Sequence, residues 1–478
     1  MRRAKIICTI GPASRSPETL ERLIRHGMDV ARLNMSHGTY AEHHEVVRNV
    51  RRLAKESGRA VAIMLDLQGP RIRVGDLPQP LTLESGQTVR LVAAHTSGDL
   101  AEKSVAGEPV IPIDYESLTQ SLRPGARVMM DDGLIEMVAD RVEQDSVICT
   151  VITGGQLKAR KGVNFPGTRL NLPSLTDKDW RDVQFGLDHE VDYIALSFVR
   201  SAEDIRALKL VIADQSSSVP IIAKVERPEA IERLDEILAS ANGVMIARGD
   251  LAIEMSPEDV PILQKQIIRA ANRHRRIVIT ATQMLESMTT NPTPTRAEAT
   301  DVANAIFDGT DAVMLSAETS IGRYPIDALQ VMDRIIRRAE GADRVREPET
   351  RLDSGGARSI PEAVCTAAVT AADTIRAKAI LAMTERGATA QLVAALRPAV
   401  PIIALTPFEQ VRRRLAMIWG VVPYILSPIA NTDTRIAAGV ELAKAAEGIR
   451  AGDDLVVLTG VQVQQPGGTN LMKIHHVE

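Results

Sequence analysis

The chain has 478 residues, more than one hydrophobic core usually supports, so two or three domains are expected. Apolar residues make up 45% and charged residues 25% of the chain, which is typical of a folded soluble enzyme and excludes global disorder. The 57 Lys and Arg residues and 61 Asp and Glu residues give a net charge of −4, so no overall field recruits nucleic acid or an anionic membrane.

Short apolar, β-branched runs alternate with amphipathic helical patterns along most of the chain. The expected strands are 5–9, 30–34, 61–66, 193–198, 221–226, 243–250, 277–282 and 312–316. The expected helices are 16–27, 40–58, 175–187, 201–214, 258–274 and 326–340. Apolar strands that are each followed by a helix are typical of a parallel sheet, and eight such units predict a closed (β/α)8 TIM barrel of about 250 residues. Segments 1–70 and 171–345 together fit that size.

The barrel pattern is interrupted between its third strand and the helix at 175–187. Residues 71–170 contain period-two segments at 87–94, 125–140 and 145–155, separated by Gly, Pro and Asp turns. We interpret this region as a small all-β domain, a β-barrel inserted after the third strand. An insertion there lies over the C-terminal face of the barrel, so we expect it to act as a mobile lid.

A third region follows the polar linker at 346–359. Expected strands at 379–384, 401–406, 421–426, 454–460 and 471–477 alternate with helical stretches. This order predicts an open α/β sandwich, which we place at 355–478.

Cysteine usage and hydropathy indicate a cytoplasmic protein. Cys8, Cys149 and Cys365 are odd in number and far apart, which favours reduced thiols over a disulfide framework, and their spacing is not that of a zinc site. The basic start has too short an apolar run for a signal peptide, and no later run is long enough to cross a bilayer.

Polar residues gather where the expected barrel strands end. They are Arg32, Asn34, Asp66, Lys224, Glu226, Asp250, Thr282, Ser316 and Glu318. Charged groups are rarely buried unless they are paired or bind a metal, so this convergence indicates a polyanionic, metal-bound ligand. Each residue also has a structural interpretation: Lys224 and Glu226 could form an ion pair, and Asp250 could cap a helix. As a set, they favour the functional interpretation.

Glu226 and Asp250 lie on adjacent strands and are sufficient protein ligands for Mg²⁺, which keeps waters and recruits substrate oxygens. Lys224, two residues before Glu226, would project beside the metal. That arrangement suits neutralisation of a phosphoryl group during transfer.

Several long motifs resemble those of the pyruvate kinase family, in family order and spacing. They are CTIGPASRSPETL (8–20), VARLNMSHG (30–38), LDLQGPRIRVG (65–75), IIAKVERPEAIERLDEI (221–237), VMIARGDLAIE (244–254), the run from TATQ to SAET (280–319) and PGGTNLMKIHHV (466–477). The resemblance covers nearly the whole chain. It implies a glycolytic phosphotransferase that moves a phosphoryl group from phosphoenolpyruvate to ADP, giving pyruvate and ATP.

The resemblance also assigns catalytic and substrate-binding roles. Glu226 and Asp250 match the Mg²⁺ or Mn²⁺ ligands, Lys224 matches the lysine that stabilises the transferring phosphoryl group, and Arg73 matches its clamp. The backbone of Ala247, Arg248, Gly249 and Asp250 opens a helix that suits the pyruvate carboxylate. Thr282 matches the face where the enolate is protonated, with Ser316 and Glu318 as outer members of a water relay; the proton donor itself stays open.

On the nucleotide side, the matching residues are Arg32, Asn34, His37, Arg73 and Lys178, with Arg32 also matching a substrate-binding position. For His37 a surface loop histidine is an open alternative. The 3% aromatic content leaves few side chains for stacking on adenine.

The residue type at the position of Arg71 differs between two groups of the family. Members that need K⁺ carry Glu at this position, whereas members that work without K⁺ carry a basic residue and resemble this chain at Leu67, Gln68 and Val74. A fixed guanidinium could supply the charge of the ion, so we expect no K⁺ requirement. Residues that resemble the K⁺ ligands of the family are present, namely Asn34, Ser36, Asp66 and, by its position, Leu67. Binding of a K⁺ ion that activity does not require therefore stays an open alternative.

The segment 383–398 resembles the effector loop of the family. Thr384, Arg386, Gly387 and Thr389 keep the pattern that binds a phosphate of a sugar-phosphate or nucleotide effector, whereas Glu385 departs from it and would repel a phosphate. The family also implies a homotetramer. Two other function classes stay open on residues alone: a different barrel enzyme acting on phosphoenolpyruvate or an oxo acid, and a non-catalytic sensor of a phosphometabolite.

Overall fold

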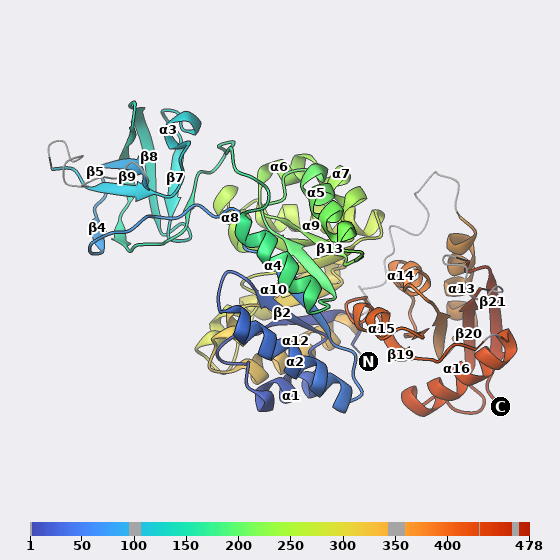
Figure 1. Ribbon diagram of the computed structural model, residues 1–478. Coiled ribbons are helices and arrows are strands. Elements are labelled where there is room, and N and C mark those ends of the chain that lie inside the picture. The colour runs from blue at the N-terminus through green and yellow to red at the C-terminus, as the bar shows by residue number, and fades with distance from the viewer. Residues whose placement is uncertain (1, 95–106, 343–358, 430, 461–467) are drawn as a thin grey trace.

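The computed structural model describes residues 2–94, 107–342, 359–429, 431–460 and 468–478. Three bodies follow one another in Figure 1: a β-rich region at one end, a barrel in the middle and an α/β region at the other end. Most of the expected linker at 346–359 lies outside the described residues. The domain boundaries given above stay predictions.

Eight parallel strands close into a barrel in the order β1-β16-β15-β14-β13-β12-β3-β2. This confirms the expected fold class. The strands are β1 (Lys5–Thr9), β2 (Val30–Asn34), β3 (Ala62–Asp66), β12 (Tyr193–Leu196), β13 (Ile221–Val225), β14 (Gly243–Ala247), β15 (Ile277–Ala281) and β16 (Ala312–Leu315).

Helices surround the barrel and return the chain to the next strand. They are α1 (Pro17–His26), α2 (Tyr40–Glu56), α4 (Asp177–Asp188), α5 (Ala202–Asp214), α6 (Pro228–Glu232), α7 (Leu234–Ser240), α8 (Arg248–Glu254), α9 (Val260–Arg273), η2 (Glu286–Thr289), α10 (Arg296–Asp308), α11 (Ala317–Ser320) and α12 (Pro325–Glu340). Local sequence sets several ends: Ser16 caps α1, which stops at left-handed Gly27, and Thr39 with Glu42 forms a capping box on α2. Their apolar faces pack on strands that are buried on both sides.

The inserted region forms β-sheets with a core of their own. A six-stranded sheet has the order β11-β7-β8-β9-β5-β6, and β10 pairs with β4. Isolated bridges from Arg73 to Gly162, beside β11, and from Val74 to Ile113 of β6 connect the two edges of the six-stranded sheet. Its elements are β4 (Leu81–Leu83), β5 (Thr88–Ala93), β6 (Val110–Ile113), α3 (Leu118–Ser121), β7 (Arg127–Met130), β8 (Ile135–Val142), β9 (Ser146–Thr153), β10 (Gly155–Leu157) and β11 (Val163–Asn164). Phe165 and Leu91 belong to a hydrophobic cluster separate from that of the barrel.

The C-terminal region is a five-stranded sheet of order β19-β18-β17-β20-β21, parallel except for its last strand. Apolar clusters cover both faces of the sheet. The elements are α13 (Ile360–Ile375), β17 (Ala379–Met383), α14 (Ala388–Ala395), β18 (Ile402–Thr406), α15 (Glu409–Leu415), β19 (Val421–Ile425), α16 (Thr432–Glu447), β20 (Asp454–Thr459) and β21 (Leu471–His476).

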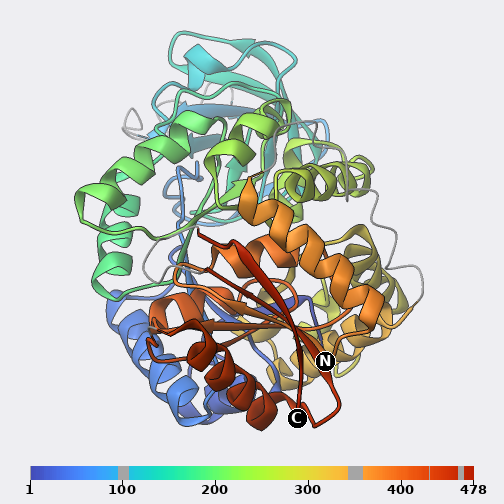
Figure 2. The same cartoon turned by 90° about the vertical axis from the view of Figure 1, so that its right-hand side faces the viewer.

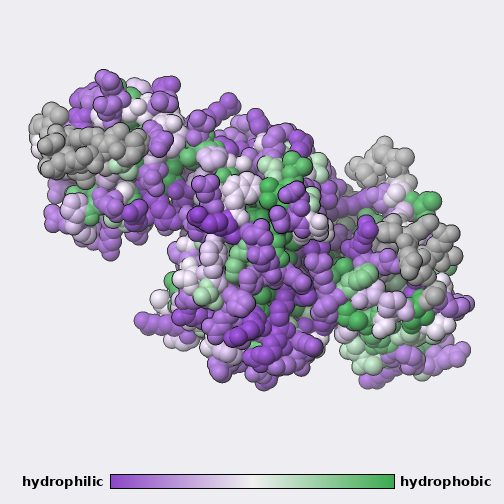
Figure 3. All heavy atoms as spheres, viewed as in Figure 1, coloured by the Kyte–Doolittle hydropathy of each residue, from purple (hydrophilic) through white to green (hydrophobic). Residues whose placement is uncertain are grey.

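Hydrophilic residues cover most of the face drawn in Figure 3, with hydrophobic patches over the barrel and over the C-terminal body. In the described part of the chain, Cys8, Cys149 and Cys365 are buried free thiols. Within the same residues, no helix has the length and hydropathy needed to cross a membrane.

Hydrogen bonds and ion pairs join the barrel to the C-terminal sheet region, which lies in front of the barrel in Figure 2. Tyr193 Oη donates to the Arg414 carbonyl oxygen at 2.7 Å, and Arg413 Nε lies 3.0 Å from Asp192 Oδ1. The buried Lys5 Nζ donates to the Val421 carbonyl oxygen at 2.7 Å. The contact therefore contains a lysine removed from water.

Lys5 makes stability depend on pH in a predictable direction. Burial lowers its pKa from 10.5 to about 8, only partly opposed by attraction to Asp29. Between these two pH values the unfolded chain keeps a proton that the folded chain has lost, so rising pH favours folding, by at most about 3 kcal/mol. We expect the unfolding free energy of the native chain to rise relative to Lys5→Met across this window in urea titrations. A pH-independent difference between the two proteins would contradict this.

Candidate active site

Charged side chains from neighbouring strands meet at the C-terminal end of the barrel. Asp66 ends β3 and Lys224 lies in β13, where Glu226 directly follows. In a parallel barrel all these strand ends open on one face. Residues that are far apart in sequence thus come within direct contact.

Lys224 is the centre of this cluster. Its Nζ lies 2.9 Å from Glu226 Oε1 and 3.3 Å from Asp66 Oδ1, and it donates to Ser197 Oγ at 2.7 Å. Ser197 Oγ in turn donates to the Leu67 carbonyl oxygen at 2.6 Å. These contacts within the protein hold the ammonium group in one position.

The protonation states of the cluster follow from burial and mutual attraction. Burial alone would lower the pKa of Lys224, but Asp66, Glu226 and Asp250 outweigh it and raise that pKa above its ordinary value. Burial alone would raise the pKa of Asp66, but Lys224 and Arg32 hold it below the ordinary value. For Glu226, burial and repulsion from Asp250 exceed the attraction of Lys224, and the pKa is raised.

A left-handed residue fixes the second oxygen of Glu226. Phe198 has φ +53° and its N–H donates to Glu226 Oε2 at 2.7 Å. Such a conformation costs a bulky residue of order 1–3 kcal/mol and persists only where the surroundings enforce it. Gly69 permits the approach, because a Cβ there would lie 2.8 Å from the Phe198 ring. Glu226 Oε1 is left to face the cluster.

Arg32 lies on the same face of the barrel, where its guanidinium is hydrogen-bonded to other side chains. Its Nε donates to Asp66 Oδ2 at 2.6 Å and its Nη1 to Thr9 Oγ1 at 2.9 Å. The three carboxylates Asp66, Glu226 and Asp250 therefore outnumber the two cations Lys224 and Arg32. Among these five groups one negative charge is unbalanced, which favours a bound cation.

Two groups expected on the nucleotide side or around K⁺ are engaged within the protein. Asn34 Oδ1 accepts from the Ser36 N–H at 3.1 Å. Lys178 Nζ donates to the Met35 carbonyl oxygen at 2.7 Å and to Asp182 Oδ2 at 2.6 Å.

The start of α8 contacts the segment that follows β15. Thr282 is left-handed, with φ +67°, and its Oγ1 accepts from the Gly249 N–H at 2.8 Å. Arg248, which follows Ala247 at the helix start, is buried and donates to the Thr282 carbonyl oxygen at 2.7 Å and to Asp301 at 2.8 Å. The Arg248 guanidinium thus holds the strained turn, and the Gly249 amide is already used.

Glu318 and Ser316 lie after β16. Glu318 accepts from the N–H groups of Leu285 and Ser316, at 2.9 and 2.6 Å, and its burial raises its pKa. Ser316 Oγ is buried and lacks a hydrogen-bond partner among the described residues. The raised pKa makes protonation of the Glu318 carboxylate easier than it is for a carboxylate in water.

Arg71 and Arg73 lie where the barrel joins the inserted sheets. Arg71 Nη2 contacts Asp132 Oδ1 at 2.7 Å, and Arg73 Nη1 donates to the Arg160 carbonyl oxygen at 3.2 Å. Burial first, then the charges of Arg73, Arg71 and Arg32, lower the pKa of His37. His37 is thus kept neutral beside this group of arginines.

The donor set fits a divalent ion such as Mg²⁺. Glu226 Oε1 and Asp66 Oδ1 are buried and have no well-directed hydrogen bond from the described residues, although Lys224 lies within ion-pair distance. Among those residues, no group of three His, Cys, Asp or Glu side chains could hold a metal by itself. The second expected ligand, Asp250, is close enough to raise the pKa of Glu226, and two carboxylates completed by water and substrate oxygens are what Mg²⁺ accepts.

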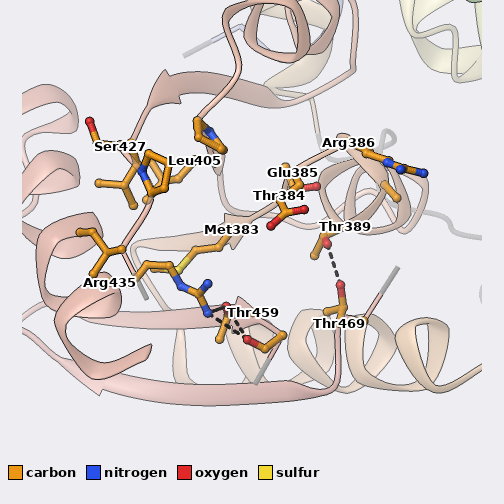
Figure 4. A pocket seen from close by; sticks show the side chains of 17 residues that line it. Met383, Thr384, Glu385, Arg386, Thr389, Leu405, Ser427, Arg435, Thr459 and Thr469 are labelled. Atoms are coloured by element: carbon orange, nitrogen blue, oxygen red, sulfur yellow. Dashed lines mark hydrogen bonds between the residues drawn. The ribbon is translucent and has the colours of Figure 1, made fainter. Parts of the chain in front are cut away.

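The expected effector residues line a cavity of about 110 Å³ in the C-terminal region, shown in Figure 4. Thr384, Arg386 and Thr389 belong to its wall, whereas Gly387 borders a neighbouring cavity. Thr389 Oγ1 lies 2.6 Å from Thr469 Oγ1, and Arg435 Nη2 donates to Thr459 Oγ1 at 2.8 Å. Arg435 Nε is buried without a hydrogen-bond partner in the described part of the chain.

Sequence reasoning missed Ser197, Phe198 and Asp132. The sequence pattern predicts an extended strand at 193–198 that contains the first two, whereas β12 ends at Leu196 and the next residues turn toward Glu226. Their place after a barrel strand was an available signal. Nothing in the sequence indicates that Asp132 pairs with Arg71.

Comparisons with known proteins agree along the chain. The family model described as pyruvate kinase, barrel domain, matches residues 1–329, and that described as pyruvate kinase, alpha/beta domain, matches residues 362–475. A pyruvate kinase of Sporosarcina psychrophila is 42% identical over 479 residues, covering 99% of this chain and 80% of the relative. One of Agrobacterium vitis is 42% identical over 474 residues, covering 99% and 96%. The crystal structure of a Cryptosporidium parvum pyruvate kinase matches with a TM-score of 0.93 and 37% identity, covering 100% of this chain and 96% of that chain.

Proposed function

The chain belongs to the pyruvate kinase family, and we propose that it transfers the phosphoryl group of phosphoenolpyruvate to ADP, giving pyruvate and ATP. The observation that carries the proposal is the contact of Lys224 with both Asp66 and Glu226 at the C-terminal end of the barrel. Because the chain belongs to this family, its site residues do not need to be explained by a different barrel enzyme or by a non-catalytic sensor of a phosphometabolite.

Lys224 stabilises the phosphoryl group in transit. That group carries its charge on three equatorial oxygens, and catalysis of its transfer is mostly positioning and electrostatic stabilisation. An ammonium fixed by Ser197 and two carboxylates does not need to reorganise as the charge moves. Arg73 clamps the same group from the side of the inserted sheets, which act as the lid.

Glu226 and Asp250 would hold Mg²⁺ or Mn²⁺. A bound divalent ion supplies positive charge against the phosphate and carboxylate oxygens of the substrate. Phe198 keeps Glu226 oriented through its N–H. The backbone at 247–250, apart from the Gly249 N–H that donates to Thr282 Oγ1, receives the substrate carboxylate, with Arg32 assisting.

Thr282 lies on the face where the enolate of pyruvate takes up its proton. Ser316 and Glu318 extend a water relay from that face, and the raised pKa of Glu318 favours its holding a proton. Arg32, Asn34, His37 and Lys178 contact the nucleotide.

The family resemblance supports four further proposals. The enzyme works in glycolysis, in the cytoplasm, as a homotetramer. The cavity around Thr384, Arg386 and Thr389 takes a sugar-phosphate or nucleotide effector, with Gly387 shaping the loop and Glu385 disfavouring bisphosphates.

A steady-state assay tests the proposed reaction. Pyruvate release from phosphoenolpyruvate and ADP should require Mg²⁺ or Mn²⁺ and should form ATP in equal amount. Absence of turnover by folded protein at saturating metal would refute the function.

Arg71 leads to a prediction about monovalent cations. Its guanidinium is held by Asp132 and packs over Gly162, where an added Cβ would lie 2.8 Å from Arg71 Nη2. A fixed charge about 4 Å from an anion is worth roughly 4 kcal/mol at intermediate screening, enough to replace an ion. We expect the rate to change by less than about twofold when tetramethylammonium replaces K⁺, since no free cation is needed.

The matching variant is Arg71→Glu, which should create a K⁺ requirement. Arg160→Glu reverses a charge in the same region, where Arg160 pairs with Asp76, and should leave the response to K⁺ unchanged. Strong K⁺ activation of the native chain would show that Arg71 does not substitute for the ion.

A further inference from the structure

A second cavity, of about 230 Å³, lies between the barrel and the C-terminal sheet region. Tyr193 and Ile277, at the starts of β12 and β15, border it on one side, and Gln391 of α14 and Arg414 of α15 border it on the other. It therefore opens at the end of the barrel opposite the candidate active site. Of the described residues, Arg386 alone borders both this cavity and the one in Figure 4.

The wall of this interdomain cavity is strongly cationic. Five arginines border it, Arg275 and Arg276 from the barrel and Arg386, Arg397 and Arg414 from the C-terminal region. One carboxylate borders it among the described residues, Asp311, whose Oδ1 pairs with Arg397 Nη2 at 2.8 Å.

Neighbouring groups offset only part of this charge. Arg275 pairs with Glu362, and Arg276 donates to the carbonyl oxygens of Leu238 and Ala239. Like charges thus face one another across the junction of the two domains, and an anion between them would relieve the repulsion.

Arg414 and Arg397 carry donors that the protein does not satisfy. Arg414 Nε and Nη2 and Arg397 Nη1 are buried and have no hydrogen-bond partner among the described residues. The Arg397 guanidinium stacks over Trp419 with its carbon 4.7 Å from the ring centroid, which fixes its plane. Buried donors without a partner are uncommon and costly, and here they belong to side chains that border a cavity.

Burial is also the main cause that lowers the pKa of Arg414, ahead of the opposing attraction of Asp192. The surrounding protein therefore does not fully compensate this charge. A ligand with acceptor oxygens would do so.

We propose that the interdomain cavity binds the phosphate group of a small phosphorylated metabolite, held by Arg414 and Arg397. The guanidinium fork matches phosphate oxygens in geometry and charge. The volume admits a phosphate together with a small attached group. A ligand in this place contacts both domains and holds them together, whatever reaction the barrel carries out.

Binding by the full-length protein tests the proposal. Inorganic phosphate and ribose 5-phosphate are titrated by calorimetry and by thermal unfolding, at ionic strength matched with KCl. We expect saturable binding and a raised Tm, and at least about tenfold weaker binding in Arg414→Gln, because charge-assisted hydrogen bonds are lost. Equal affinity for both probes identifies phosphate itself as the ligand, whereas tighter binding of the ester identifies a phosphorylated metabolite.

Three variants separate this cavity from other anion sites. Arg450→Gln removes an exposed arginine of the same region and should bind as the native chain does. Arg435→Gln alters the cavity of Figure 4, so it should weaken only binding there and should keep the binding event that Arg414→Gln removes. Arg414→Lys, which keeps the charge but loses the fork, should be intermediate.

The basal activity of each variant shows that it has folded. Arg414 borders the cavity at the end of the barrel opposite the candidate active site, so its replacement should not change phosphate binding in that site. If Arg414→Gln keeps every binding event of the native chain, or if the event missing in Arg414→Gln is also missing in Arg435→Gln, the proposal is overturned.

Discussion

Replacing Lys224 with methionine is expected to lower kcat by about 10²- to 10³-fold, the size of effect seen when one preorganised charge-stabilising donor is removed from a transition state. The ammonium is held by Ser197, Asp66 and Glu226 at 2.7 to 3.3 Å, so it contributes a fixed charge rather than a mobile one. Methionine keeps most of the volume and removes that charge.

The expected loss is in kcat rather than in substrate affinity. The proposed Arg73 clamp and the proposed metal would still hold the ground state, and an interaction that strengthens in the transition state mainly raises kcat. We therefore expect the KM for phosphoenolpyruvate to change little. Steady-state kinetics at saturating Mg²⁺ measures both constants.

Lys444→Met is the matched control, because Lys444 pairs with Glu441 at the surface of the C-terminal region. It should keep native kinetics. Lys224→Met also leaves buried carboxylates without their partner, so its Tm must be measured with the metal present. A folded Lys224→Met protein with near-native kcat would eliminate the proposed role of this lysine.

Replacing Glu226 with glutamine is expected to raise the Mg²⁺ concentration needed for half-maximal activity by at least about 100-fold. Even side chains that only orient a metal ligand are worth about 10- to 100-fold in affinity, and Glu226 is proposed as a direct ligand. Glutamine keeps the shape and can still accept from the Phe198 N–H.

Metal-free stability separates this effect from misfolding. Burial, with repulsion by Asp250, raises the pKa of Glu226, so the ionised carboxylate is disfavoured by its surroundings. Neutralising it should leave the metal-free Tm unchanged or raised, while the increase in Tm caused by Mg²⁺ disappears.

Glu232→Gln serves as the control for Glu226→Gln, since Glu232 is exposed on α6 a few residues away. It should keep the native response to Mg²⁺ in both activity and Tm. A Glu226→Gln protein that is still stabilised and activated by millimolar Mg²⁺ would place the metal elsewhere.

The sequence by itself determined the architecture, because the apolar pattern of each segment shows which faces are buried and the order of the segments shows how they connect. Runs such as 5–9 and 221–225 are apolar on both faces and alternate with capped helices, and a closed parallel barrel buries all of them. Element ends depend on more than the apolar pattern: that pattern predicts one strand at 243–250, but β14 stops at Ala247 and α8 starts at Arg248, where the family resemblance implies a helix start. Arg248 donates to the Thr282 carbonyl oxygen in the turn after β15, and no local pattern contains this contact.

For the site, the sequence identified Lys224 and Glu226, since residues two apart on a strand share a face. The tertiary structure alone decided what holds them. Asp66 ends another strand, Ser197 and the left-handed Phe198 directly follow a third, and closing the barrel brings them into contact. The pairing of Arg71 with Asp132 and the arginine-lined cavity between two domains likewise depend on how separate segments pack. Contacts between distant segments follow from the summed packing of the whole chain, which a local pattern of residues does not encode.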